Sequence, residues 1–320
     1  AWRSSGKGVP PPPPRVMDSV PLLADIDFSD WGKGGEQMTE EWAIRTISSY
    51  LTTMLAGRNP MYFQELTVHL TQKCNLRCLD CSAMIPFFPS PRHYAPEIVT
   101  QSLQNLLSYD GVQFREICLL GGETLLYPDL EKVLEFSLSI SRDEQVSIVT
   151  NGTLLPKESL LPLMRHPRFF VRISDYGALS TKKRELTELL EAHGIRYELD
   201  NYSEWYRDRD HLTAPCGEEE ASRKYRHCTN IKYRILVEGR FFPCCKAAQM
   251  CQMGIFPATP ENSIDCLTAE GLHERLRAGL RHFEQCGHID ICHRCYGIPQ
   301  IHPDTMVPPA IQAAGPLYLS

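Results

Sequence analysis

The chain has 320 residues, which is enough for one large domain with a substantial core and a second, smaller one. Its formal net charge of −6 argues against sequence-independent binding of nucleic acid, and no apolar run approaches the roughly 20 residues that span a bilayer. Thirteen cysteines, odd in number and clustered in two zones, favour thiolate ligands in a reducing cytoplasm over disulfides.

The first 210 residues predict an N-terminal arm and then an α/β fold. Residues 1–60 hold the proline run Pro10–Pro14, typical of an extended arm, and a helix that Thr39 is expected to cap and that ends near Leu55. Strands then alternate with helical patterns over residues 61–210, which indicates parallel βαβ units. The strands are expected at 65–71, 115–120, 145–150, 169–174 and 195–199, with a sixth beyond residue 200. This predicts a partial (β/α)6 barrel followed by a small C-terminal domain.

Side chains with reactive or ligating groups come directly after these strands. Cys74, Cys78 and Cys81 follow the first strand at C-x3-C-x2-C spacing. Three thiolates on one short loop leave the fourth position of a metal centre open, unless His69 or His93 completes a zinc site. The other residues at strand ends are Gly121, Gly122, Glu123, Asn151 and Ser174. Because such ends share one edge of a parallel sheet, the sequence predicts a site there.

With this spacing and strand context, residues 62–200 resemble the radical SAM superfamily. The resemblance implies a [4Fe–4S] cluster on the three cysteines, S-adenosyl-L-methionine (SAM) on its fourth iron, and hydrogen-atom abstraction by a 5′-deoxyadenosyl radical. It also implies that Gly121 and Gly122 let the backbone approach SAM and that Glu123 holds the amino group of its methionine. Asn151 and Ser174 are candidates for contacts to the methionine or ribose of SAM.

A second cysteine zone occupies residues 211–300. Cys228 and Cys244 lie on either side of a hairpin predicted at 233–237 and 240–243, and Cys292-x2-Cys295 follows. Four thiolates saturate one cluster, and the pattern resembles the auxiliary-cluster domain called twitch, which implies an auxiliary [4Fe–4S] cluster. A structural zinc on the same thiolates is the alternative. Residues 301–320 are expected to form a C-terminal tail.

Cys245 and Cys251 are left as candidate hydrogen-atom donors. If Cys244 and Cys245 lie on a strand, their side chains point to opposite faces, so that Cys245 faces away from the auxiliary cluster. Pro243-Cys244-Cys245 is similar to a motif of radical SAM epimerases in which the second cysteine quenches the substrate radical. The sequence therefore favours an epimerase.

The expected substrate is a small polar natural product, such as an aminosugar or an aminoglycoside-like compound in antibiotic biosynthesis. The residues that would suit a cationic sugar are Asp200, Glu204, Trp205, Tyr206, Asp208 and Asp210. The expected electron donor is a one-electron reductant such as flavodoxin or ferredoxin. The alternatives are a dehydrogenase that oxidises a secondary alcohol to a ketone through the auxiliary cluster, a peptide epimerase, and a zinc-stabilised binding protein without enzymatic activity.

Overall fold

A computed structural model describes residues 61–142, 144–207, 215–295, 306–315 and 317. Its largest element is a sheet whose centre is made of five parallel strands in the order β5-β4-β3-β2-β1. These strands are β1 (Met61–Thr71), β2 (Val112–Gly121), β3 (Gln145–Thr150), β4 (Phe169–Asp175) and β5 (Tyr197–Asn201). β1 is central, and Leu66 and Leu70 on it are fully buried. The expected α/β fold with a parallel sheet is confirmed.

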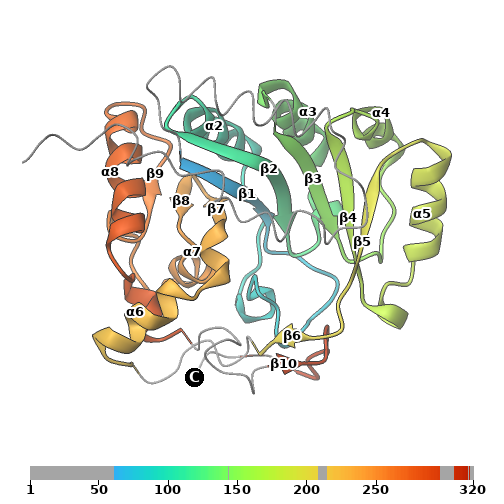
Figure 1. Ribbon diagram of the computed structural model, residues 1–320. Coiled ribbons are helices and arrows are strands. Elements are labelled where there is room, and N and C mark those ends of the chain that lie inside the picture. Colours follow the sequence, from blue (N-terminus) through green and yellow to red (C-terminus); the bar gives the residue numbers. More distant parts are fainter. Residues whose placement is uncertain (1–60, 143, 208–214, 296–305, 316, 318–320) are drawn as a thin grey trace, which may run out of the picture. The chain divides into compact units, whose positions relative to one another are not determined.

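The helices between these strands lie along one side of the sheet (Figure 1). They are α2 (Pro96–Leu107), α3 (Leu130–Ile140), α4 (Leu161–Met164) and α5 (Lys183–Ala192). α2 begins with a proline, which needs no hydrogen-bond acceptor in the first turn, and it buries Val99, Leu103 and Leu106 along one stripe. The opposite side of the strands is thereby left for polar side chains.

The predicted hairpin extends this sheet beyond β1, on the side away from β5. β7 (Tyr233–Val237) pairs parallel to β1, and it turns into the antiparallel strands β8 (Arg240–Phe242) and β9 (Ile264–Asp265). β7 is the sixth parallel strand, but it lies beside β1 and not beyond β5. Its buried residues 234–237 can pair there because the second edge of β1 is open. A domain boundary at residue 210 stays a prediction.

The remaining α-helices are α6 (Glu218–Arg226), α7 (Cys245–Gln252) and α8 (Leu272–Gln285), which is followed by the 3-10 turn η10 (Asp290–His293). β6 (Trp205–Tyr206) and β10 (Met306–Val307) form a separate strand pair. Among the residues that the structure describes, no helix is long and apolar enough to cross a membrane. The predicted arm and helix of residues 1–60 lie outside the described residues.

The sequence suggests a strand at Cys244 and Cys245, but in the structure Cys245 lies on a helix. Helix α7 begins at Cys245, and Cys244 is its N-cap, with the Cys244 Sγ accepting the N–H of Ala247 at 3.5 Å. The two thiols still point in different directions, but they do so because one caps the helix and the other lies in its first turn.

Candidate radical site

The cysteine loop leaves β1 and brings three thiols close together. Burial, with the nearby Cys81 and Cys78 as lesser causes, raises the pKa of Cys74 to about 12. Burial likewise raises the pKa of Cys78 to about 11, and Cys81 adds to the shift. Three thiolates this close repel one another unless cations lie between them. The donor set therefore fits an iron–sulfur cluster, whose irons supply those charges.

N–H groups surround the sulfurs of this loop. The N–H of Leu76 donates to Cys74 Sγ at 3.4 Å, and the amide of Asn151 reaches the same sulfur at 3.8 Å. The side-chain amide of Gln312 donates to Cys78 Sγ at 3.2 Å. Such N–H···S bonds are among the interactions that tune the reduction potential of a cluster.

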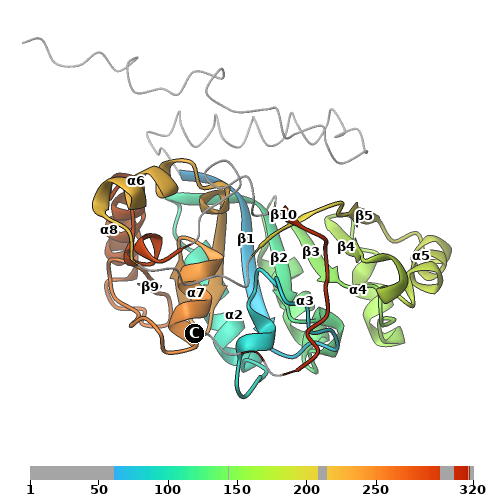
Figure 2. The same cartoon turned by 90° about the horizontal axis from the view of Figure 1, so that it is seen from below.

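Gln312 comes from a tail segment that runs along the loop (Figure 2). Leu79 donates its N–H to the carbonyl of Ile311 at 2.8 Å, and Ala313 donates to the carbonyl of Arg77 at 2.8 Å. The backbone N–H of Arg77 donates to the side chain of Gln312 at 2.8 Å. The tail segment 311–313 is therefore hydrogen-bonded along the cysteine loop.

The end of β2 lies directly against this loop. A Cβ on Gly122 would lie 2.3 Å from the carbonyl oxygen of Lys73 and 2.8 Å from the Cβ of Cys74. A Cβ on Gly121 would lie 2.5 Å from the Cγ2 of Thr71. Only glycine fits at both positions without moving the loop. Glycine is thus required here for contact between β2 and the cysteine loop.

Glu123 joins the ends of β2 and β3. One carboxylate oxygen accepts the N–H of Leu125 at 3.0 Å and the hydroxyl of Thr150 at 2.8 Å, and the other accepts the N–H of Asn151 at 2.8 Å. Burial raises the pKa of Glu123, and these hydrogen bonds oppose the shift. Among the described residues the second oxygen has this one donor, so that it retains capacity to accept from a bound ligand.

Asn151 and Ser174 lie at the ends of β3 and β4, as predicted, and both are buried. The amide of Asn151 donates to the side chain of Asn75 at 3.0 Å, so Asn151 contacts the cysteine loop directly. The hydroxyl of Ser174 lies among the phenol groups of Tyr176 and Tyr202. Their suggested contacts to a cofactor stay predictions.

Residues 68–174 match the family model of the Radical SAM superfamily. The chain contains a radical SAM domain. Such a domain implies the [4Fe–4S] cluster and SAM, and the three thiols, their N–H donors and the glycine contact fit that pair.

Curated relatives match a part of the chain. GTP 3′,8-cyclase of Limosilactobacillus fermentum is 34% identical over 94 residues, which are 29% of this chain and 27% of the relative. Molybdenum cofactor biosynthesis protein 1 of Drosophila melanogaster is 33% identical over 134 residues, 41% of this chain and 22% of the relative. The radical SAM chain thus spans about a quarter of the length of these relatives.

Two solved structures resemble the fold at low identity. Streptococcus suis SuiB bound to its precursor peptide SuiA is 12% identical with a TM-score of 0.48, over 89% of this chain and 81% of that chain. BtrN in complex with AdoMet and 2-DOIA is 15% identical with a TM-score of 0.42, over 73% of this chain and 85% of that chain.

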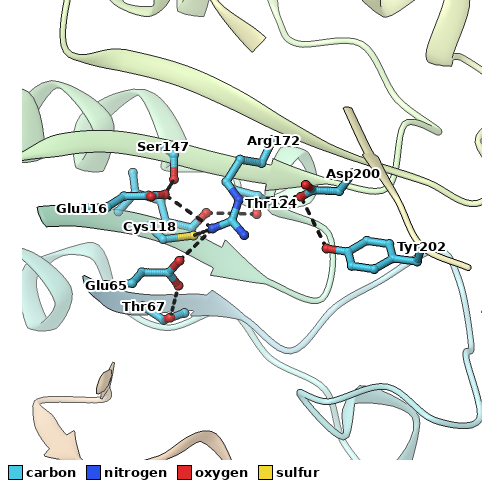
Figure 3. Close-up of polar contacts among 10 residues, drawn as sticks. Glu65, Thr67, Glu116, Cys118, Thr124, Ser147, Arg172, Asp200 and Tyr202 are labelled. Carbon is cyan, nitrogen blue, oxygen red and sulfur yellow. Dashed lines mark hydrogen bonds and ion pairs between the residues drawn. The ribbon is translucent and has the colours of Figure 1, made fainter. Parts of the chain in front are cut away.

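The inner face of the radical SAM sheet carries a polar network around Arg172 (Figure 3). The Nη1 of Arg172 lies 2.7 Å from Glu65 and 3.5 Å from Glu116, and its Nε lies 3.7 Å from Asp200. Ser147 donates to Glu116. Burial, followed by the charge of Glu65, raises the pKa of Glu116 to about 7. One guanidinium faces three carboxyl groups, so this inner face carries an excess of negative charge.

A second buried polar pair joins the same face to α7. His69 lies on the same side of β1 as Glu65, because alternate residues of a strand share a face. Its Nδ1 lies 3.3 Å from the amide nitrogen of Gln249, which lies 3.9 Å from Cys245 Sγ. His69 Nε2 and Gln249 Oε1 are both buried and have no hydrogen-bond partner among the described residues. Burial lowers the pKa of His69 to about 4, so that its ring is neutral at pH 7.

The two candidate hydrogen donors differ in their surroundings. Cys245 donates to the carbonyl oxygen of Ser82 at 3.3 Å, one residue beyond the last cysteine of the loop. Cys251 points instead to the carbonyl of Pro257 at 3.7 Å, in the segment that follows α7. The two candidate thiols, of which the sequence made Cys251 the second choice, thus have different surroundings.

The four thiols predicted for an auxiliary cluster lie near one another. Burial, then the proximity of Cys228, raises the pKa of Cys244. Burial raises the pKa of Cys292 to about 12, with Cys295 and Cys228 as further causes. Arg234 lies close to Cys244 and Cys228, and its buried Nε has no partner in the described part of the chain. A buried cation with such an N–H beside these two thiols is compatible with an anionic cluster.

Several residues at the candidate site were not predicted from the sequence. Two residues that the sequence did suggest lie outside the described part of the chain. Gln312, Gln249 and Asn75 contact the site, but nothing in their local sequence marks them. Of the residues suggested for a cationic sugar, Asp200 pairs with Arg172. Asp208 and Asp210 lie outside the described residues.

Proposed function

We propose that this radical SAM enzyme is an epimerase of a small, cationic, polar substrate, with Cys245 as the hydrogen-atom donor. The observation that carries the proposal is the hydrogen bond from Cys245 Sγ to the Ser82 carbonyl, at 3.3 Å. It joins the thiol to the loop that carries Cys74, Cys78 and Cys81. A donor beside the loop at which the radical originates can reach the same substrate carbon.

The cluster and SAM, when bound, supply the radical that removes one hydrogen atom from the substrate. Cys245 then donates a hydrogen atom to the substrate carbon: its S–H bond breaks, a C–H bond forms on the opposite face, and a thiyl radical is left. One electron from a reductant such as flavodoxin or ferredoxin and one proton from solvent restore the thiol. The substrate is neither oxidised nor reduced overall.

Charge and aromatic side chains support a cationic, sugar-like substrate. The three carboxyl groups around Arg172 leave the inner face negative, which favours an ammonium group. Tyr176, Tyr202 and Trp205 form an aromatic group at the ends of β4 and β5, with ring centroids 5.2 to 6.3 Å apart. Aromatic faces suit both cations and the apolar face of a sugar ring.

The auxiliary cluster is part of the same proposal. Cys228, Cys244, Cys292 and Cys295 would hold a second [4Fe–4S] cluster, with Arg234 balancing part of its charge. Since Cys244 is adjacent to Cys245, this cluster would lie next to the thiyl radical and could pass it an electron. A dehydrogenase would use the same cluster in the opposite direction, to accept an electron from the substrate.

The test is turnover in deuterated water with a panel of aminosugars and aminocyclitols, under a strong reductant. An epimerase gives a product with one deuterium at the inverted carbon. In Cys245→Ala we expect 5′-deoxyadenosine to form without deuterium uptake, whereas Cys251→Ala should still take up the label.

Product mass separates the outcomes. A product two mass units lighter than the substrate would mean oxidation and would overturn the epimerase in favour of a dehydrogenase. Deuterium uptake that persists in Cys245→Ala and disappears in Cys251→Ala would overturn the assignment of the donor.

A further inference from the structure

Three ligating side chains converge away from the radical site, between α6 and η10. The Nε2 of His288 lies 3.0 Å from one carboxylate oxygen of Glu218, and the Nε2 of His293 lies 3.7 Å from the other. The two Nε2 atoms are 3.2 Å apart, with the ring planes at 90°. All three ligand atoms thus face one point.

The backbone fixes which nitrogen of His293 carries the proton. Its Nδ1 lies 2.8 Å from the carbonyl oxygen of Cys216, which can only accept, so this nitrogen must be an N–H donor. In the neutral ring the Nε2 therefore presents a lone pair toward His288 and Glu218. The Nδ1 of His288 is held in turn by the hydroxyl of Ser222 at 3.0 Å. Histidines that bind a metal are typically oriented in this way by their second nitrogen.

The spacing of the three atoms matches a tetrahedral ion. With Zn–N bonds of about 2.0 to 2.1 Å, two nitrogen ligands on tetrahedral zinc lie about 3.3 Å apart. The side chains of His288 and His293 are 18% and 25% exposed, while that of Glu218 is 80% exposed. The histidines are thus held rigidly from the protein side, and the carboxylate side stays open to an ion and to a water molecule as fourth ligand.

We propose that Glu218, His288 and His293 bind one divalent transition-metal ion, with Zn²⁺ as the best fit. The ion would join the first turn of α6 to the segment that carries Cys292 and Cys295. Its role would be to tie these two segments together. The alternative is that one proton bridges the two rings, with no metal present.

The test uses the full chain with its iron–sulfur clusters reconstituted anaerobically, so that iron occupies the cysteines. The protein is stripped of loose metal on a chelating resin, supplied with zinc sulfate and desalted, and its iron and zinc are counted by elemental mass spectrometry. We expect about one zinc per chain, and at least a tenfold weaker retention in Glu218→Gln and in His288→Ala. The control is His227→Ala, an exposed histidine at the end of the same helix.

Zinc-edge X-ray absorption then identifies the ligands. We expect only nitrogen and oxygen neighbours, with iron content the same in all four proteins. Sulfur neighbours would mean that zinc occupies cysteines and would overturn the proposal. The proposal would also be overturned if the wild-type chain bound no zinc, or if the two variants retained zinc as well as the wild type. A joint loss of zinc and iron would overturn it too, because it would mean that the segment had unfolded.

Discussion

Gly122 offers the sharpest test of how β2 supports the cysteine loop. An alanine there would bring its Cβ to 2.3 Å from the carbonyl oxygen of Lys73, 2.6 Å from the carbonyl carbon and 2.8 Å from the Cβ of Cys74. Ordinary contacts begin near 3.4 Å. The loop would therefore have to move by about 1 Å, and the atoms in its way are backbone, which cannot turn aside.

The movement has two costs. The N–H of Glu123 donates to the carbonyl of Lys73 at 2.9 Å, and this bond would stretch. Overpacking of this kind costs about 1 to 3 kcal/mol of stability. The larger effect is on chemistry, because Cys74 moves with the loop, and a shift of about 1 Å in a reacting group can cost about 100-fold in rate. We expect Gly122→Ala to fold and to lose about two orders of magnitude in SAM cleavage.

The assay is iron content after anaerobic reconstitution, together with 5′-deoxyadenosine formed from SAM under dithionite. Gly217→Ala is the matched control, since a Cβ there meets no atom of the described residues within 4 Å and the φ of −72° is ordinary. If Gly122→Ala cleaves SAM within twofold of the wild type, the close approach of β2 to the loop does not matter for the reaction and this reasoning is wrong.

Three further predictions concern the inner face of the sheet. The pKa of Glu116, raised by burial to about 7, exceeds its ordinary value of 4.5, so the folded chain retains a proton that the unfolded chain releases. Stability should thus fall as pH rises from about 4.5 to about 7, by up to about 1.4 kcal/mol per pH unit. Glu116→Gln should flatten this slope in denaturant unfolding; an unchanged slope would contradict it. Arg172→Met leaves Glu65 and its neighbours without a counter-charge, so the free energy of unfolding in denaturant should fall by about 3 to 5 kcal/mol. A loss of stability below about 1 kcal/mol would show that the ion pairs are screened. The double variant His69→Leu/Gln249→Met removes two buried polar atoms without partners among the described residues. Its free energy of unfolding should therefore rise by about 1 to 3 kcal/mol, while its turnover falls. A loss of stability would mean that the pair serves packing alone.

The local features of this chain could be predicted from the sequence, because the signals are themselves local. Cys74, Cys78 and Cys81 lie within eight residues, and the spacing alone brings them together. The reactive residues after β2 and β3 follow from the alternation of strands and helices, since parallel strands end at one edge. Those parts of the candidate site required no knowledge of distant contacts.

The parts that escaped prediction depend on pairings across long stretches of chain. β7 could have joined the sheet at either edge. In the structure it pairs with β1, and its own sequence does not specify that edge. The start of α7 was missed because Cys244 caps it, and cysteine is not among the usual capping residues. Gln249 reaches His69 across 180 residues, and no periodicity of either segment records that contact.

The contact between Gln312 and Cys78 links cluster insertion to the order of synthesis. Gln312 follows Cys78 by 234 residues, so it is translated after all the strands and helices between them. A cluster acquired earlier would lack this N–H···S bond and the cover of residues 311–313. Its sulfur would face water and oxidants, and its reduction potential would differ from that of the finished enzyme. A cluster inserted after the tail has bound the loop would therefore have this cover and this N–H···S bond from the start.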